Sequence, residues 1–386
     1  MSRRIQGTLI ASFIGIGLLL GSGQSAAVVA PPAYSGLVIF GDSLSDTGNV
    51  LSLTTAFAQP PFPSFPGAPG RFSDGPVWTE YLASGLGLAG SAAPSNLLFD
   101  GTSVVPIGAL GGQNYAYGGA RTGLGGSAGA TTGRLGQLVA WDQSASILAP
   151  GGALTRAADP NALYVVMAGA NDLRDYRSGV SGAADPATVA GNVVGALGLL
   201  ANAGARHFLV SNLPDLGRTP EAIGLGLQTA STSATVSFNS ALSSMIGSFD
   251  AAFNLAHGVD LDIRSIDFFG LFKSVDEDAQ HNGGAHYGIT NVTSPCITPG
   301  PVSGQYFFAD AVGVACNVAA FSDPLHPSAA AHALLGDLAV QTALAPVPEP
   351  RTYAMLLTGL LVLGLGLGRR AGLGVRAGAA GTHRAL

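Results

Sequence analysis

The feature that most constrains this chain is a series of short apolar runs that alternate with longer, helix-length stretches. Five runs of strand length occur, at residues 36–40, 113–117, 163–168, 207–211 and 259–266. The helix-length stretches lie at 133–148, 187–203, 221–249 and 327–344. Alternating strands and helices are typical of a parallel sheet covered by helices on both faces. The sequence therefore predicts an α/β fold, with residues 31–346 as one domain.

Glycine and small polar residues follow four of these runs. The clusters read GDSLSDTGN, GGARTG, GAND and NLPDLG, in chain order. Each one alone is explained by turn chemistry, because Gly, Asn, Asp and Ser dominate turns. The carboxyl ends of parallel strands, however, meet at one edge of a sheet, where ligands bind. Together the clusters predict a polar site at that edge.

The clusters contain the parts of a serine nucleophile site. Ser43 follows the first run, at the point where the strand is expected to turn into a helix, and a serine hydroxyl needs an adjacent base to remove its proton. Asp323 and His326 stand three apart in FSDPLHP and supply an imidazole base with a carboxylate to orient it. The backbone N–H groups of Ser43 and Gly119 and the side-chain amide of Asn171 are candidate donors to an oxyanion. The set predicts acyl-transfer chemistry.

These motifs resemble the GDSL, or SGNH, hydrolase family. GDSLSDTGN is similar to its first block, NYAYGGAR to the second, GAND to the third and DPLHP to the fifth, and the resemblance runs over residues 37–344. GRFSDGPVWTEYLA and NLPDLGRTP resemble the branch with phospholipase- or lecithinase-like and plant GDSL esterases. The resemblance implies a flavodoxin-like three-layer α/β/α sandwich with about five parallel strands, and no metal or organic cofactor.

The resemblance also implies a role for each candidate residue. Ser43 would be the nucleophile and first oxyanion donor, with Gly119 and Asn171 as the other donors. His326 would be the general base and acid, and Asp323 its partner. The implied function is a serine esterase or lipase that works through an acyl-enzyme on lipid, phospholipid or acetylated polysaccharide. An acyltransferase and a non-catalytic surface or matrix binding protein on the same fold are the alternatives.

Both ends of the chain are typical of targeting segments. Residues 1–30 contain two arginines, an apolar run and the small-residue stretch GSGQSAAVVA, which is the layout of a signal peptide. A membrane anchor is the alternative, but the run is shorter than the ~20 apolar residues of a span. Residues 347–386, with VPEPRTYAMLLTGLLVLGLGLGRRAG, resemble a PEP-CTERM sorting tail, although residues 371–386 extend past the usual end. A plain C-terminal anchor is the alternative there.

These segments predict the location and partners of the protein. We expect export to the periplasm, cell surface or extracellular matrix of a Gram-negative bacterium, contact with tail-processing sorting machinery, and membrane contact through the tail. The formal net charge of −6 provides no basic surface for a nucleic acid.

Only two cysteines occur, Cys296 and Cys316. In an exported chain such a pair predicts a disulfide. A metal site with His281 and His286 is disfavoured because the spacing matches no zinc pattern. The cysteines lie in a long segment, 276–318, that either shapes the pocket or decorates the surface. The proline- and phenylalanine-rich stretch 59–75 either lines a substrate groove or forms a rigid crossover.

Overall fold

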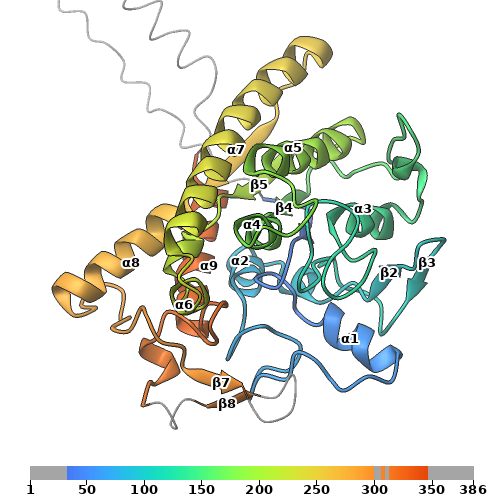
Figure 1. Cartoon of the computed structure of the whole chain (residues 1–386). Helices are drawn as coiled ribbons and strands as arrows, with labels where there is room; N and C mark the ends of the chain where they lie inside the picture. The colour runs from blue at the N-terminus through green and yellow to red at the C-terminus, as the bar shows by residue number, and fades with distance from the viewer. Residues whose placement is uncertain (1–32, 300–305, 309–312, 347–386) are drawn as a thin grey trace, which may run out of the picture.

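The computed structural model describes residues 33–299, 306–308 and 313–346 (Figure 1). The predicted signal peptide and sorting tail lie outside these residues, so both stay predictions. Within the described part of the chain, none of the helices combines the length and the apolar character needed to cross a membrane.

A four-stranded parallel sheet forms the centre of the fold. Its strands are β1 (Leu37–Phe40), β4 (Leu163–Val166), β5 (His207–Ser211) and β6 (Asp262–Ile266), in the order β1-β4-β5-β6. Every residue of β1 and β4 is buried. Continuous apolar runs of this kind suit strands that are covered on both faces. The predicted α/β class is confirmed.

The predicted fifth strand at 113–117 is wrong as a strand. The segment does run parallel to β1, because Ile39 N–H donates to Gln113 O at 3.0 Å and Tyr115 N–H donates to Ile39 O at 2.8 Å. With β1 it forms only an isolated bridge, at Asn114, because the next backbone donor of the ladder, Gly41 N–H, binds Gln137 Oε1 instead. With this segment at the edge, the order in space is the 2-1-3-4-5 of flavodoxin-like sheets.

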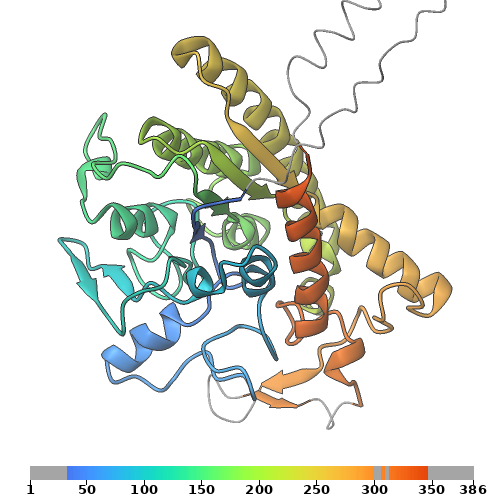
Figure 2. The same cartoon turned by 180° about the vertical axis from the view of Figure 1, so that it is seen from behind.

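Helices cover both faces of the sheet (Figures 1 and 2). α5 (Pro186–Asn202) and α7 (Gln228–His257) pack together on one face, and α2 (Trp78–Gly85) packs against α9 (Ala329–Leu344) on the other. The helix predicted at 221–249 is divided into α6 (Pro220–Gly224) and α7. Gly226 separates them with a φ of 67°, which a helix does not accommodate.

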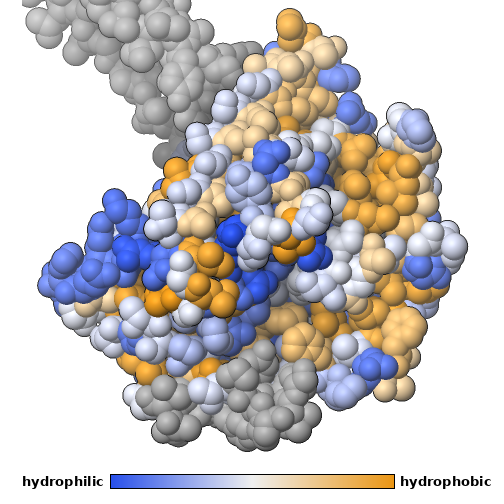
Figure 3. All heavy atoms as spheres, viewed as in Figure 1, coloured by the Kyte–Doolittle hydropathy of each residue, from blue (hydrophilic) through white to orange (hydrophobic). Residues whose placement is uncertain are grey.

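The remaining elements border the site or cover its flanks. α3 (Arg134–Asp142) is shorter than predicted, and α1 (Asn49–Ala56), α4 (Ala170–Arg177) and α8 (Phe268–Asn282) were not predicted. β2 (Leu97–Phe99) and β3 (Val104–Pro106) form one hairpin, and β7 (Ile297–Pro299) and β8 (Tyr306–Phe308) form another. Short 3-10 helices lie at Ala89–Ala92, Ser146–Leu148, Leu216–Arg218 and Cys316–Val318. Figure 3 shows hydrophilic residues over α8 and hydrophobic residues on the opposite side of this face, around α1 and α3.

Candidate active site

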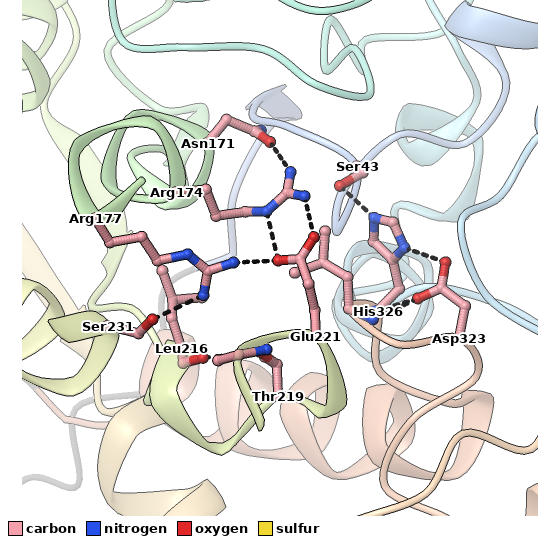
Figure 4. Close-up of polar contacts among 12 residues, drawn as sticks. Ser43, Asn171, Arg174, Arg177, Leu216, Thr219, Glu221, Ser231, Asp323 and His326 are labelled. Atoms are coloured by element: carbon pink, nitrogen blue, oxygen red, sulfur yellow. Dashed lines mark hydrogen bonds and ion pairs between the residues drawn. The ribbon is translucent and has the colours of Figure 1, made fainter. Parts of the chain in front are cut away.

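Ser43, His326 and Asp323 form one hydrogen-bonded chain at the carboxyl edge of the sheet (Figure 4). His326 Nε2 lies 2.9 Å from Ser43 Oγ, and His326 Nδ1 lies 2.8 Å from Asp323 Oδ2. The other Asp323 oxygen accepts the backbone N–H groups of Leu325 and His326, so the carboxylate is held on both sides. The arrangement can transfer the serine proton to the imidazole.

Asp323 is a buried carboxylate that stays ionised. Burial alone would raise its pKa, but the charge and hydrogen bonds of His326 and the backbone donors outweigh burial, so the pKa of Asp323 lies below its ordinary value. A carboxylate in this state stabilises the imidazolium that forms when His326 takes a proton.

The backbone N–H groups of Ser43 and Gly119 lack an acceptor. In the described part of the chain, no hydrogen bond uses the N–H of Ser43 or of Gly119, and both residues line the same cleft. The N–H of the neighbouring Gly118 is taken by Asp46, at 2.9 Å. Of the two adjacent glycines, Gly119 is therefore the one with a free donor. Asn171 borders the same cleft.

Glycine is required at both positions of this loop. Gly119 has a φ of +74°, and a Cβ on it would lie 2.7 Å from Ser127 Cβ. A Cβ on Gly118 would lie 2.3 Å from the Phe72 ring, which also packs 5.1 Å from the His326 ring. A side chain at either position would displace a wall of the site.

Four buried polar side chains, here called the rim network, hold the loops around Ser43. The network consists of Asp46, Asn49, Asn114 and Gln137. Gln137 bonds to both the N–H and the carbonyl of Gly41, two residues before Ser43, at 3.0 and 2.7 Å. The rim network thereby fixes where the first strand ends and where the loop of Ser43 begins.

The side chains of the rim network also bind the backbone N–H and carbonyl groups of the loops that carry them. Asp46 accepts four backbone N–H groups, from residues 48, 49, 50 and 118. Asn49 donates to the carbonyls of residues 114 and 116, and Asn114 donates to the carbonyl of Ser45. Burial nevertheless raises the pKa of Asp46 to about 6. Asp46 is thus a turn acceptor, and it also joins the loop of Ser43 to the loop of Gly119.

Asp42 lies next to Ser43 and is also fully buried. Its Oδ1 accepts Leu44 N–H at 3.1 Å, and its Oδ2 has no partner in the described structure. Burial raises the pKa of Asp42 to about 6. Ser43 itself lies in a single turn, and α1 begins only at Asn49, so the predicted position of Ser43 at a helix start is wrong.

A cluster of charged side chains lies next to Asn171, and the sequence did not predict it (Figure 4). Arg174 and Arg177, on α4, both form ion pairs with Glu221, on α6. Burial would raise the pKa of Glu221, but the hydrogen bond from Arg174 and the charges of both arginines hold it below its ordinary value. One signal was available: GANDLRDYR places Asn171, Arg174 and Arg177 at intervals of three, on one face of a helix.

One cleft of about 830 Å³ is lined by Ser43, Asp323 and His326, by the adjacent glycines Gly118 and Gly119, and by Asn171, Arg174 and Glu221. One wall of the cleft is apolar and includes Val50, Leu53, Phe62 and Leu98, and its polar end includes Arg174 and Glu221. The stretch 59–75 contributes Phe62 and Phe72 to this wall while Phe65 is buried behind them. The proline-rich stretch therefore lines the cleft and also packs on the core.

Cys296 and Cys316 are joined in a disulfide, with their Cα atoms 5.0 Å apart. Cys296 is buried in the same apolar cluster as the cleft residues Leu53 and Phe72. The described part of the segment 276–318 therefore supports the cleft wall from behind. Among the described residues, the one group with the geometry of metal ligands is Asp74 with these two cysteines, and the cysteines are already bonded to each other.

The chain matches known proteins over most of this fold. Residues 37–339 match the family described as GDSL-like Lipase/Acylhydrolase. A GDSL esterase/lipase of Arabidopsis thaliana is 31% identical over 342 residues, which cover 82% of this chain and 88% of the plant protein.

Bacterial relatives match over shorter regions. Esterase EstA of Pseudomonas aeruginosa is 33% identical over 243 residues, 59% of this chain and 36% of that protein. A phosphatidylcholine-sterol acyltransferase of Aeromonas hydrophila is 30% identical over 198 residues, 50% of this chain and 48% of that protein. The chain thus spans about a third of EstA and about half of the Aeromonas protein. With the family match over residues 37–339 and the four motifs around one cleft, the chain belongs to the GDSL-like lipase/acylhydrolase family.

Proposed function

We propose that the protein hydrolyses carboxylic esters with Ser43 as nucleophile, His326 as general base and acid, and Asp323 as the partner of His326. The observation that carries the proposal is the chain of hydrogen bonds from Asp323 through His326 to Ser43 Oγ, at 2.8 and 2.9 Å. Ser43 Oγ attacks the ester carbonyl while His326 Nε2 takes its proton. His326 then protonates the departing alcohol, and a water activated by the same nitrogen releases the acid.

The negative oxygen of the tetrahedral intermediate binds among three donors. These are the unpaired N–H groups of Ser43 and Gly119 and the Asn171 amide, and all three residues border the cleft. Donors that are already in place stabilise the transition state without reorganisation, and removing one such donor typically lowers kcat by about 10² to 10³.

The cleft supports an ester with an apolar acyl group. Its apolar wall, which includes Val50, Leu53, Phe62 and Leu98, provides a surface for an acyl chain. A volume of about 830 Å³ exceeds the space that an acetyl group needs. We therefore place lipid and phospholipid esters ahead of acetylated polysaccharide as substrates.

The test is hydrolysis of p-nitrophenyl esters from acetate to palmitate by the full chain and by Ser43→Ala. We expect turnover that rises toward medium or long chains and disappears in the variant. No turnover by the unaltered protein on these esters, on phospholipid or on acetylated polysaccharide would favour the binding protein instead.

Acyl transfer is the second candidate. One matched relative is named an acyltransferase. In acyl transfer, an alcohol bound in the cleft attacks the acyl-enzyme in place of water. Mass spectrometry of the products formed with a sterol or a long-chain alcohol present distinguishes the two reactions: a new ester indicates transfer, and free acid alone indicates hydrolysis.

We further propose that the protein is exported. The signal-peptide layout of residues 1–30 and the disulfide between Cys296 and Cys316 support an oxidising compartment, and residues 347–386 support delivery by sorting machinery. Mass spectrometry of both ends of the mature protein tests this proposal. Intact ends on cytoplasmic protein would contradict it.

A further inference from the structure

The side-chain amide of Asn171 is held between two partners of unambiguous chemistry. Its Nδ2 donates to the carbonyl of Ala120 at 2.9 Å, and its Oδ1 faces Arg174 Nη1 at 3.4 Å. A carbonyl only accepts hydrogen bonds and a guanidinium only donates them. If the amide were rotated by 180°, oxygen would face oxygen and N–H would face N–H. The two partners together therefore select one orientation.

Arg174 is itself fixed. Its Nε donates to Glu221 Oε2 at 3.0 Å and its Nη2 bonds to Glu221 Oε1, so the guanidinium is held by a bidentate pair. Glu221 also accepts from Arg177, whose side chain is 2% exposed and which donates to Ser231 Oγ at 2.8 Å. Figure 4 shows that this arrangement leaves Arg174 Nη1 pointing toward Asn171.

The same glutamate connects to the loop that carries the base. The backbone N–H of Glu221 donates to the carbonyl of Pro324 at 2.8 Å, and Pro324 lies between Asp323 and His326 in the chain. Glu221 thus lies between the helix of the oxyanion donor and the loop of the base. A stabilising role alone explains little, because the side chains of Arg174 and Glu221 are 31% and 21% exposed and pairs this open contribute about 1 kcal/mol or less.

We propose that Arg174 is a positioning residue that fixes the orientation of the Asn171 amide, so that the second Nδ2 hydrogen is presented to the oxyanion. The inference rests on the proposed function and extends it to a residue outside the proposed triad and its three oxyanion donors. Glu221 and Arg177 hold Arg174 in the geometry that makes this orientation the favoured one.

The test is a double-mutant cycle of Arg174→Met and Asn171→Ala, with kcat and KM measured on the best p-nitrophenyl ester. If Arg174 acts through Asn171, Arg174→Met lowers kcat by about tenfold, less than the loss of a whole oxyanion donor, and changes KM little. In the Asn171→Ala background the same substitution then has no further effect. A purely structural or long-range charge effect of Arg174 would persist in that background, and this result would overturn the inference.

A second measurement separates this inference from the proposed function. A fluorophosphonate forms a bond between its phosphorus and Ser43 Oγ, while fluoride leaves and His326 takes the serine proton, and its phosphoryl oxygen binds the same three donors as the ester oxyanion. We expect labelling of Ser43 in the unaltered protein and labelling about tenfold slower in Arg174→Met. Absence of labelling and of ester turnover in the unaltered protein contradicts the proposed function. Equal labelling rates in the two proteins would contradict the role of Arg174 and would leave the proposed function standing.

Arg218→Met is the matched control. Arg218 also forms an ion pair between two elements, with Asp276 at 2.9 Å, but it does not border the cleft. We expect its kcat and its labelling rate to equal those of the unaltered protein. A tenfold loss in this variant would show that removing an arginine ion pair is damaging in general, and would overturn the specific role of Arg174.

Discussion

The rim network and the segment 276–318 both support the cleft, but they do so by different physical means. In the rim network, buried polar side chains bind backbone groups from loops that are distant in the chain, such as Asp46 with Gly118. In the segment 276–318, a disulfide and a small apolar cluster around Cys296 provide the support. The rim network fixes the positions of individual N–H groups, whereas the residues around the disulfide only pack behind the apolar wall of the cleft.

This difference predicts different consequences of damage. A buried donor without an acceptor costs its full desolvation energy, so the rim network should not tolerate the loss of a member. A disulfide acts largely on the unfolded chain, so its removal should lower stability and leave the geometry around Ser43 unchanged.

Asp46→Ala is expected to have the largest effect. The substitution leaves four backbone N–H groups without their acceptor, three of them at the start of α1 and one on Gly118. At 1 to 3 kcal/mol for each group that water does not reach, we expect the free energy of unfolding to fall by about 4 kcal/mol. Ester turnover should fall too, because the Gly119 loop loses its attachment. Urea unfolding and p-nitrophenyl ester kinetics measure the two effects.

Asp46→Asn is the companion variant, since it keeps one acceptor oxygen and nearly the same shape. We expect a smaller loss of stability than in Asp46→Ala, with the turnover reduced but measurable. A stability of Asp46→Ala within about 1 kcal/mol of the unaltered protein would mean that water replaces the carboxylate, and the contrast between the two regions would fail.

The positions of Ser43, Asp323 and His326 were predictable because each residue stands in a short motif at the end of a strand or just before a helix. Ser43, Asn171, Asp323 and His326 all come together at the cleft as those motifs place them. The family resemblance supplied their roles, and the spacing of Asp323 and His326 agreed with it.

The features that the sequence did not predict correctly depend on contacts between segments that are distant in the chain. Glu221 pairs with Arg174 across 47 residues, and only the packing of α6 beside α4 brings them together. The fifth strand failed for a related reason. The run 113–117 has the apolar pattern of a strand, but the N–H of Gly41 at the end of β1 binds the distant Gln137 side chain and limits the pairing with β1 to a bridge.

Removal of the disulfide is expected to have the next largest effect. Cys296→Ala with Cys316→Ala opens a loop whose ends are 20 residues apart, and loop-closure entropy then predicts a loss of about 3 kcal/mol in the free energy of unfolding. Because Cys296 packs behind the wall and not beside Ser43, we expect kcat on the acetate ester to stay within about twofold.

Denaturant unfolding of the double variant, and of the unaltered protein with and without reductant, measures this effect. The reduced protein is the control, because it loses the bond and keeps both sulfur atoms. An acetate kcat that collapses while the fold persists would show that the disulfide also sets the geometry around Ser43. The two regions would then not differ in the way described above.

His332→Asn gives the smallest effect and sharpens the contrast, because His332 is a buried polar side chain that is satisfied on one side only. Its Nδ1 accepts Trp78 N–H at 3.2 Å, but its Nε2 has no partner in the described structure. Burial and the nearby His326 lower the pKa of His332 to about 3 from an ordinary 6.5. Between these two values the unfolded chain binds a proton that the folded protein does not, so stability falls as pH drops below 6.5.

At 1.36 kcal/mol for each pKa unit, His332 should remove about 2 kcal/mol of stability between pH 7 and pH 5. His332→Asn keeps an acceptor for Trp78 N–H and no longer titrates. We expect the variant to be less stable than the unaltered protein at pH 7, because it leaves a cavity, with the gap narrowing by about 2 kcal/mol at pH 5. Thermal unfolding of both proteins across this range measures the gap, and comparing them cancels Asp42 and Asp46, whose raised pKa values act in the opposite direction. If the difference in stability between the two proteins stayed constant with pH, His332 would be protonated or reached by water in the folded protein. A buried polar side chain with one unpaired nitrogen would then be no more sensitive to acid than the rim network.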